Sequence, residues 1–180
     1  MTRAFKYIIT AALALTAATA AFAGGIEPGD HLEMAAVLKA QVSPTRAVQI
    51  AEAGGGHAFT YGMEANRHGH WYEVSVLRGG AKLLLKINAE NGRVIGSRAA
   101  RGEDAQGAHA LDGSKLAFGD AIAQAERAGG GPALEANAAG HGDKAWVDVD
   151  VIQDQGKQIA HYKVSLHNGQ IQTQKTGVDA

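Results

Sequence analysis

Residues 43–97 and 115–174 carry nearly the same sequence pattern twice, and this duplication limits the possible folds more than any other feature of the chain. Each copy has an apolar-striped segment ending in glutamate, three glycines, an alternating stretch that begins with tryptophan, and a closing Asn-Gly pair. The matching positions are Glu52 and Glu126, Gly54 to Gly56 and Gly129 to Gly131, Trp71 and Trp146, and Asn91-Gly92 and Asn168-Gly169. A repeat of this kind predicts two copies of one structural unit.

Within each copy, helical spacing of the apolar residues changes to strict alternation. Ser43 is predicted to cap the first helix and Pro44 to occupy its first turn, where a missing backbone N–H costs nothing. Each alternating triplet is predicted to be the buried face of a half-solvated antiparallel strand. In the first copy the triplets are Phe59, Tyr61 and Met63; Tyr72, Val74 and Val76; and Leu83, Leu85 and Ile87. In the second copy they are Leu134, Ala136 and Ala138; Val147, Val149 and Val151; and Ala160, Tyr162 and Val164.

The expected fold class is therefore α+β, with two repeated units that each pack one helix on a three- to four-stranded antiparallel sheet. A fourth strand in each unit would lie at residues 93–95 and 170–172. A unit of about 60 residues buries only about 60% of its unfolded surface and is marginally stable alone. We therefore expect the two units to dock together.

The first 23 residues have the layout of a secretory signal peptide, with early cations, an apolar stretch and the small-x-small ending Ala21-Phe22-Ala23. Cleavage near Ala23 would leave an exported chain, periplasmic or secreted. No membrane span is expected in it, because no second long apolar stretch follows. The chain is then divided into a signal peptide (1–23), a leading segment with a short helix near Asp30 (24–42), repeat 1 (43–97), a linker (98–114), repeat 2 (115–174) and a tail (175–180).

Charge and cysteine content exclude several classes of function. Without Arg3 and Lys6 of the signal peptide, 15 of the 17 basic residues remain against 18 acidic ones. Nucleic-acid binding needs a clustered excess of lysine and arginine, so no nucleic-acid partner is expected. The chain has no cysteine, which excludes disulfides, thiol chemistry and cysteine-ligated metal sites.

The Ala-x-x-x-Ala-Glu helix, the glycine break, the tryptophan-led valine strand and the closing Asn-Gly hairpin together resemble the PepSY domain, a small bacterial α+β module. The resemblance covers both repeats and is closer in the second, from Leu116 to Ala123 and through Val149 and Val164. It implies an exported, non-catalytic binding module that modulates or inhibits an envelope peptidase or another protein partner. It does not imply an oligomeric state.

Histidines suggest an alternative function, that of a periplasmic metal- or small-ligand-binding accessory. His68 and His70 flank Gly69 in one predicted hairpin loop, and His141 lies in the matching loop of repeat 2. Imidazoles separated by one residue can bind Zn or Cu, so three nitrogens would be available if the two loops converged. The competing interpretation is that these are solvated loop histidines, because zinc sites normally have a further fixed ligand or an open water position.

The two tryptophans, Trp71 and Trp146, occupy equivalent places in the repeats and are candidate partner-binding residues. They could instead close the core or pack between the units. Asp148 and Asp150 lie on the outward face of one predicted strand, where solvated carboxylates discourage aggregation. No motif of a hydrolase, zinc peptidase, phosphate loop or dinucleotide-binding protein occurs, so no catalytic residue is predicted and the chain is not expected to be an enzyme.

Overall fold

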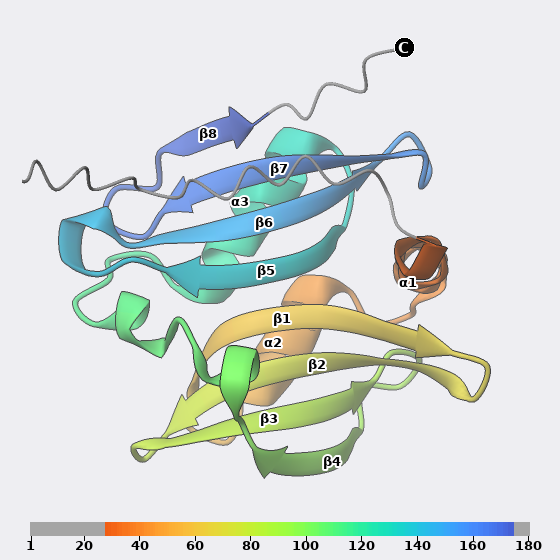
Figure 1. The fold of residues 1–180 in the computed structure, drawn as a ribbon, viewed down its shortest axis with the longest axis horizontal. Helices are drawn as coiled ribbons and strands as arrows, with labels where there is room; N and C mark the ends of the chain where they lie inside the picture. The colour runs from red at the N-terminus through yellow and green to blue at the C-terminus, as the bar shows by residue number, and fades with distance from the viewer. Residues whose placement is uncertain (1–27, 175–180) are drawn as a thin grey trace, which may run out of the picture.

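The computed structural model describes residues 28–174, in which eight strands form one antiparallel sheet (Figure 1). The signal peptide (1–23), part of the leading segment (24–27) and the tail (175–180) are predictions that lie outside the described residues. The helices are α1 (Pro28–Lys39), α2 (Pro44–Glu52) and α3 (Phe118–Gly129), with short 3-10 helices η1 (Gly102–Ala105), η2 (Ala108–Leu111) and η3 (Gly142–Lys144). The strands are β1 (His57–Asn66), β2 (Gly69–Arg78), β3 (Ala81–Asn88), β4 (Val94–Ala99), β5 (Ala133–Ala139), β6 (Trp146–Gln153), β7 (Gln158–Ser165) and β8 (Ile171–Gln174).

The fold-class prediction of two helix-on-sheet units docked together is wrong. The strand order is β4-β3-β2-β1-β5-β6-β7-β8, so strands from both repeats belong to one continuous sheet. The repeats join where β1 pairs with β5. Alternation in a sequence identifies the buried face of a strand, but it does not identify the neighbour at an unpaired edge. Repeat 1 alone would leave the edge of β1 unpaired, and repeat 2 alone would leave that of β5. Pairing β1 with β5 satisfies the backbone hydrogen-bonding groups of both edges, which is why the two sheets form one.

The junction between the repeats is close to twofold symmetric. Tyr61 pairs with Ala136, which is its own counterpart in the second repeat, and the flanking pairs are Thr60 with Asn137 and Gly62 with Glu135. Both strands also carry a register shift at equivalent positions, one after Ala58 in β1 and one after Ala133 in β5. The structure is therefore arranged like a symmetric dimer of repeats contained in one chain.

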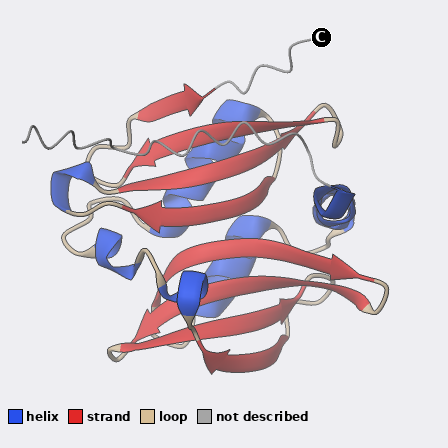
Figure 2. Cartoon of the chain, in the orientation of Figure 1, coloured by secondary structure: helices blue, strands red, loops and turns tan. Residues whose placement is uncertain are grey.

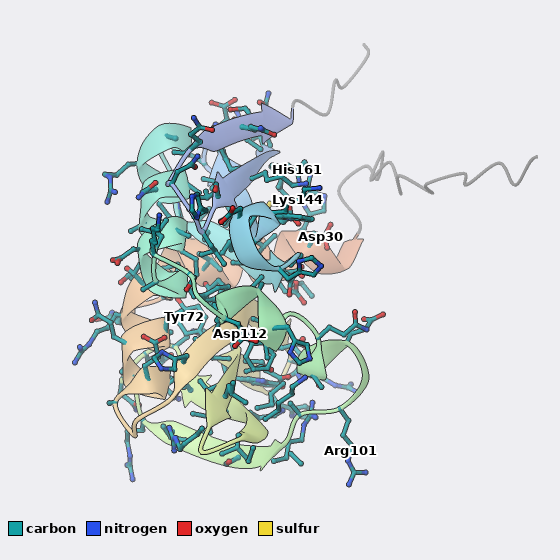
Figure 3. The ribbon with its side chains drawn as sticks, turned by 90° about the vertical axis from the view of Figure 1, so that its left-hand side faces the viewer. Asp30, Tyr72, Arg101, Asp112, Lys144 and His161 are labelled. Carbon is teal, nitrogen blue, oxygen red and sulfur yellow. The ribbon has the colours of Figure 1, made fainter. Side chains whose placement is uncertain are left out.

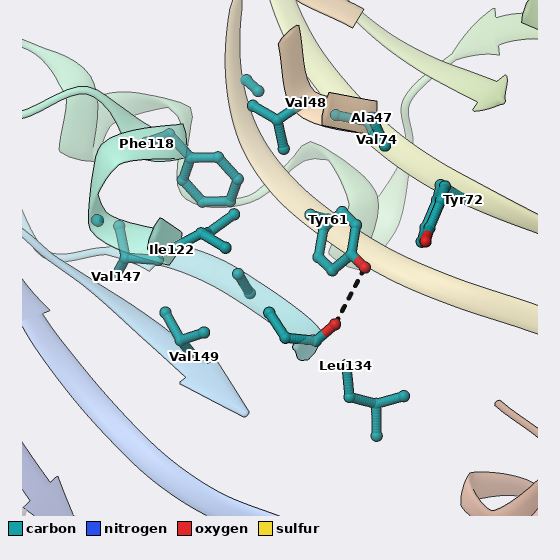
Figure 4. Close-up of a cluster of buried hydrophobic side chains, with 14 of the residues drawn as sticks. Ala47, Val48, Tyr61, Tyr72, Val74, Phe118, Ile122, Leu134, Val147 and Val149 are labelled. Carbon is teal, nitrogen blue, oxygen red and sulfur yellow. Dashed lines mark hydrogen bonds between the residues drawn. The ribbon is translucent and has the colours of Figure 1, made fainter. Parts of the chain in front are cut away.

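Helices α2 and α3 lie side by side on one face of the sheet (Figures 1 and 2). Their buried residues join those of the strands in a single hydrophobic core that spans both repeats. Figure 4 shows Tyr61 at the junction, where its hydroxyl donates a hydrogen bond to the backbone oxygen of Ala133 at 3.1 Å. This bond links β1 to β5 inside the core, where an unpaired hydroxyl would be costly.

The glutamate that ends each repeat's helical pattern ties the helix to the sheet. Glu52 accepts a hydrogen bond from the backbone N–H of Ala58 at 2.9 Å, and Glu126 accepts one from Ala133 at 3.0 Å. Both N–H groups lie at the start of a strand, next to its register shift. The repeated Ala-Glu therefore fixes where each strand begins relative to its helix.

Local signals at the helix ends agree with the structure. Ser43 caps α2 by accepting a hydrogen bond from Arg46 N, and Pro44 occupies the first turn, as predicted. Helix α3 has no side-chain cap at Ala117 and is followed by the C-cap Gly130, whose φ of 71° is left-handed. Gly131 must also be glycine, because a Cβ there would lie 1.9 Å from the backbone oxygen of Ile152.

The leading segment contains the expected helix, but α1 begins at Pro28 and has Asp30 inside its first turn rather than at its cap. Figure 1 shows α1 almost end-on, beside the ends of β1 and β5, and it contacts both strands. Met34, Ala36 and Val37 are its buried residues. Because α1 touches β1 and β5, it packs against both repeats at their junction.

The chain between the repeats crosses the face of the sheet opposite α2 and α3. Strand β4 runs to Ala99, and residues 100–114, here called the crossing segment, contain η1 and η2. Lys82 Nζ on β3 donates to the backbone oxygen of Ala105 at 2.6 Å, and Ala108 and Ala110 are buried. The residues expected to form a simple linker thus pack on the sheet.

Candidate binding surface

The two faces of the sheet differ in character. One face is covered by α2 and α3, and the other, here called the open face, carries tryptophans, carboxylates, lysines and a histidine. Figure 3 shows His161 and Asp30 on the side of the molecule opposite those helices. Strand alternation explains this, since Val74 and Val149 point to the core while their neighbours point to the open face.

In repeat 1 the open face carries a cluster built around Trp71. The indole Nε1 donates a hydrogen bond to Glu73 Oε1 at 3.1 Å, and Lys86 Nζ lies 4.4 Å from the ring centroid. Lys86 also forms an ion pair with Glu73 at 3.0 Å. The three side chains come from adjacent strands β2 and β3, whose register pairs Glu73 with Lys86. Trp71 is thus held in place by a cation–π contact and by a charged hydrogen-bond acceptor.

Repeat 2 builds the same cluster from the equivalent residues. Trp146 Nε1 donates to Asp148 Oδ2 at 2.6 Å, and Lys163 Nζ lies 4.1 Å from the ring centroid. Lys163 is 4.0 Å from Asp148, and the carboxyl side chain is 52% exposed. Burial raises the pKa of Asp148, while the Trp146 hydrogen bond and Lys163 oppose that rise.

Both tryptophans predicted to bind a partner are therefore partly buried on the open face. They do not lie in the core between the helices and the sheet. Antiparallel pairing of β1 with β5 puts Trp71 and Trp146 near opposite ends of the strands, so they do not form one aromatic site. That Trp71 and Trp146 bind a partner stays a prediction.

The structure does not bring the three candidate metal-binding histidines together. His68 lies in the turn after β1 and His70 at the start of β2, whereas His141 follows β5. Since β1 and β5 are antiparallel and meet at Tyr61 and Ala136, these loops lie at opposite ends of the sheet. At about 3.3 Å per residue, roughly 35 Å separates His68 from His141. Within residues 28–174, no group of three or more His, Asp or Glu side chains is placed to hold a metal ion.

Carboxylates from four elements meet on the open face around the junction. This acidic stripe consists of Asp30 and Glu33 on α1, Glu64 on β1, Glu135 on β5 and Asp150 on β6. Burial, followed by repulsion from Glu64, Asp30 and Glu135, raises the pKa of Glu33 to about 7. Burial also raises the pKa of Glu64 and of Glu135. The stripe is thus a region of concentrated negative charge in which protonation relieves repulsion.

Asp150 pairs with His161 across β6 and β7, and their Oδ1 and Nδ1 atoms are hydrogen-bonded. The hydrogen bond and the charge of Asp150 raise the pKa of His161. The equivalent pair in repeat 1 is Ser75 and Leu84, which also lie opposite each other. The repeats therefore differ here, with an ionisable pair in one and a neutral pair in the other.

Sequence reasoning placed Asp150 on a solvated strand face but did not identify the acidic stripe. Glu33, Glu64 and Glu135 are far apart in the sequence and converge only through the β1–β5 pairing and the position of α1. A clue was present in the duplication, because Thr60 of repeat 1 is replaced by Glu135 at the equivalent place. Because the sequence does not give the register between the repeats, it could not show that Glu135 would lie close to Glu33 and Glu64.

Among the described residues no helix is long and apolar enough to cross a membrane. No protein-family model matches the chain, and no curated protein matches it. A similar solved structure is that of a "putative lipoprotein" from Clostridium difficile 630, with 17% sequence identity and a TM-score of 0.41 over 76% of this chain and 95% of that one. At that TM-score the likeness supports no argument about fold or function.

Proposed function

We propose that this protein is an exported, non-catalytic binding module of the PepSY type that engages an extended polypeptide, such as a segment of an envelope peptidase. The observation that supports this most is the outer edge of β4. In the described sheet β4 is a terminal strand, and its Val94 and Ile95 side chains are 51% and 56% exposed. An edge of this kind can accept a further strand through backbone hydrogen bonds.

Natural proteins usually protect sheet edges with charges, prolines or covering segments. Along β4 the only ionisable residue is Arg98, which pairs with Asp104 of η1 at 2.8 Å and so is turned toward the crossing segment. The opposite edge, β8, exposes Ile171 to a smaller extent, 39%. Strand addition at β4 would therefore cover apolar side chains without removing a charge from water.

A binding role also agrees with how the open-face side chains are used. Glu73 and Lys86 pair with each other around Trp71, and Asp148 and Lys163 flank Trp146. Such mutual pairing stabilises a surface and holds its aromatic rings in place. Export is proposed from the pattern of residues 1–23 alone.

A photo-crosslinking amino acid at Ile95 tests this function in the cell envelope. The same amino acid at Ile171 and at Leu32, which is 61% exposed, provides matched controls away from the β4 edge. We expect one partner protein to crosslink at position 95 and not at the two control positions. The purified partner should bind this protein, and Val94→Lys in this protein should weaken that binding. If that partner is a peptidase, its activity should change on binding. Identical adducts from all three positions, or none, would rule out the β4 edge.

A further inference from the structure

One half of the open face is already covered by a segment of the chain. Over repeat 1, η1 contacts β3 and η2 contacts β1, and η2 also reaches β5 of repeat 2 (Figure 1). Beneath this crossing segment, Ser75 and Leu84 are only 0% and 2% exposed, although both point away from the helices. The crossing segment is anchored by the Lys82 bond to Ala105. Repeat 1 thus shows how a polypeptide lies across this face of the sheet.

Over β6 and β7, the equivalent surface of repeat 2 has no such cover among residues 28–174, and the strand of that repeat that η2 contacts is β5. Ser75 pairs with Leu84 in repeat 1, and Asp150 pairs with His161 in repeat 2. Asp150 is therefore the equivalent of Ser75, and His161 is the equivalent of Leu84. The Asp150 and His161 side chains are 31% and 27% exposed. A surface that holds a polypeptide segment in one repeat is therefore bare in the other.

The bare surface also has a different charge from the covered one. Glu135 takes the place of Thr60, Asp150 that of Ser75, and the acidic stripe continues through Glu64 to α1. In the described part of the chain no lysine or arginine lies within salt-bridge distance of Glu33, Glu64 or Glu135. Within β5, β6 and β7 the one lysine is Lys163, and it lies over Trp146. A partner lying on this surface must bring positive charge to balance it.

We propose that the open face over β6 and β7, together with the adjoining acidic stripe, is a docking site for an extended polypeptide segment rich in lysine or arginine. The segment would cross the strands of repeat 2 as residues 100–114 cross those of repeat 1. The inference rests on the proposed function, because both require polypeptide binding, but it uses a surface separate from the β4 edge. The occupant is a polypeptide because the equivalent surface holds one. It is basic because carboxylates, Glu135 and Asp150, replace the neutral Thr60 and Ser75, and His161, in place of Leu84, pairs with Asp150 alone among them.

A basic segment would gain more here than on an ordinary acidic surface. Glu33, Glu64 and Glu135 are partly removed from water, and Glu64 and Glu135 both repel Glu33. A lysine or arginine between them would relieve repulsion while forming charge-assisted hydrogen bonds. The apolar stems of those side chains could lie along Trp146 at one end of the surface.

The test measures binding of a fluorescent peptide of about ten residues that alternates lysine with threonine, using the full chain without its predicted signal peptide. We expect saturable, salt-sensitive binding that weakens about tenfold in the double variant Glu135→Gln/Asp150→Asn. The matched control, Glu90→Gln/Asp154→Asn, removes the same charge from two exposed turns and should bind normally. Amide chemical shifts should change along β5 and β6 and not along β4.

Several results would overturn the docking site. These are no binding of the lysine peptide by the unaltered chain, equal binding by the double variant, or displacement by spermine at the same charge concentration. Peptides in which glutamate or serine replaces lysine separate this inference from the proposed function. Suppose that the serine peptide binds, that Val94→Lys abolishes this binding and that the double variant leaves it unchanged. The proposed binding at the β4 edge would then be supported, and the docking site for a basic segment would be refuted. If no peptide binds, both fail.

Discussion

Replacing Ile122 by alanine tests whether the two repeats form one cooperative structure. Ile122 lies on α3 in repeat 2 and is 0% exposed, in a core shared by both repeats. Removing a buried isoleucine to alanine costs about 2–5 kcal/mol, because transfer energy is lost and a cavity remains. For a domain of this size, a loss of about 3 kcal/mol lowers the melting temperature by roughly 6–12 °C.

The two tryptophans provide one probe for each repeat. Trp146→Phe leaves Trp71 to report on repeat 1, and Trp71→Phe leaves Trp146 to report on repeat 2. Because β1 and β5 are hydrogen-bonded and the core is continuous, Ile122→Ala should lower the melting temperature seen by both probes equally. Neither half has enough buried surface to stay folded when the other unfolds.

Leu32→Ala, which removes an apolar side chain that is 61% exposed, is the control and should shift the transition by little. Fluorescence melts of the two single-tryptophan proteins, with and without Ile122→Ala, give the answer. If the Trp146 transition moved while the Trp71 transition stayed in place, the repeats would unfold separately and the reasoning from the shared sheet would be refuted.

Three further variants test individual contacts. Glu33→Gln should raise stability at pH 8 by about 1 kcal/mol and have little effect at pH 4, because the raised pKa of Glu33 makes stability fall as pH rises from about 4.5 through 7. Urea midpoints at both pH values measure this effect, and an equal gain at pH 4 would contradict it. Glu126→Gln should lower stability by about 1 kcal/mol, because it weakens the hydrogen bond from the Ala133 N–H. The Ala133 amide should then lose protection from hydrogen exchange, and unchanged protection would show that this bond does not hold the strand to the helix. Tyr61→Phe should cost about 1–2 kcal/mol in urea unfolding, since it leaves the Ala133 oxygen without that donor, and a neutral result would mean that water replaces the hydroxyl.

The parts of this fold that could be predicted are those set by nearby residues. Tyr72, Val74 and Val76 alternate with polar residues because one side of β2 faces the core, and that signal is present in any short window. The cap at Ser43 is equally local. Edge pairing is not local, since the energy of joining β1 to β5 depends on two segments about 75 residues apart.

The candidate surface was only partly predictable for the same reason. Trp71 and Trp146 could be singled out from the duplication, but their partners Lys86 and Lys163 become neighbours through strand register. The crossing segment has no period, and its burial depends on small residues such as Ala108 fitting against the sheet. Small size alone does not distinguish a packed segment from a solvated one.

The pairing of Tyr61 with its own counterpart has a consequence for how such a chain can diversify. A lone repeat would have to build this sheet by associating with a second copy, and both halves would then be identical. Covalent linkage removes that obligation, so substitutions such as Ser75 against Asp150 can accumulate on one side only. The tandem arrangement can thereby present a surface that has no symmetry, while its scaffold remains that of a homodimer.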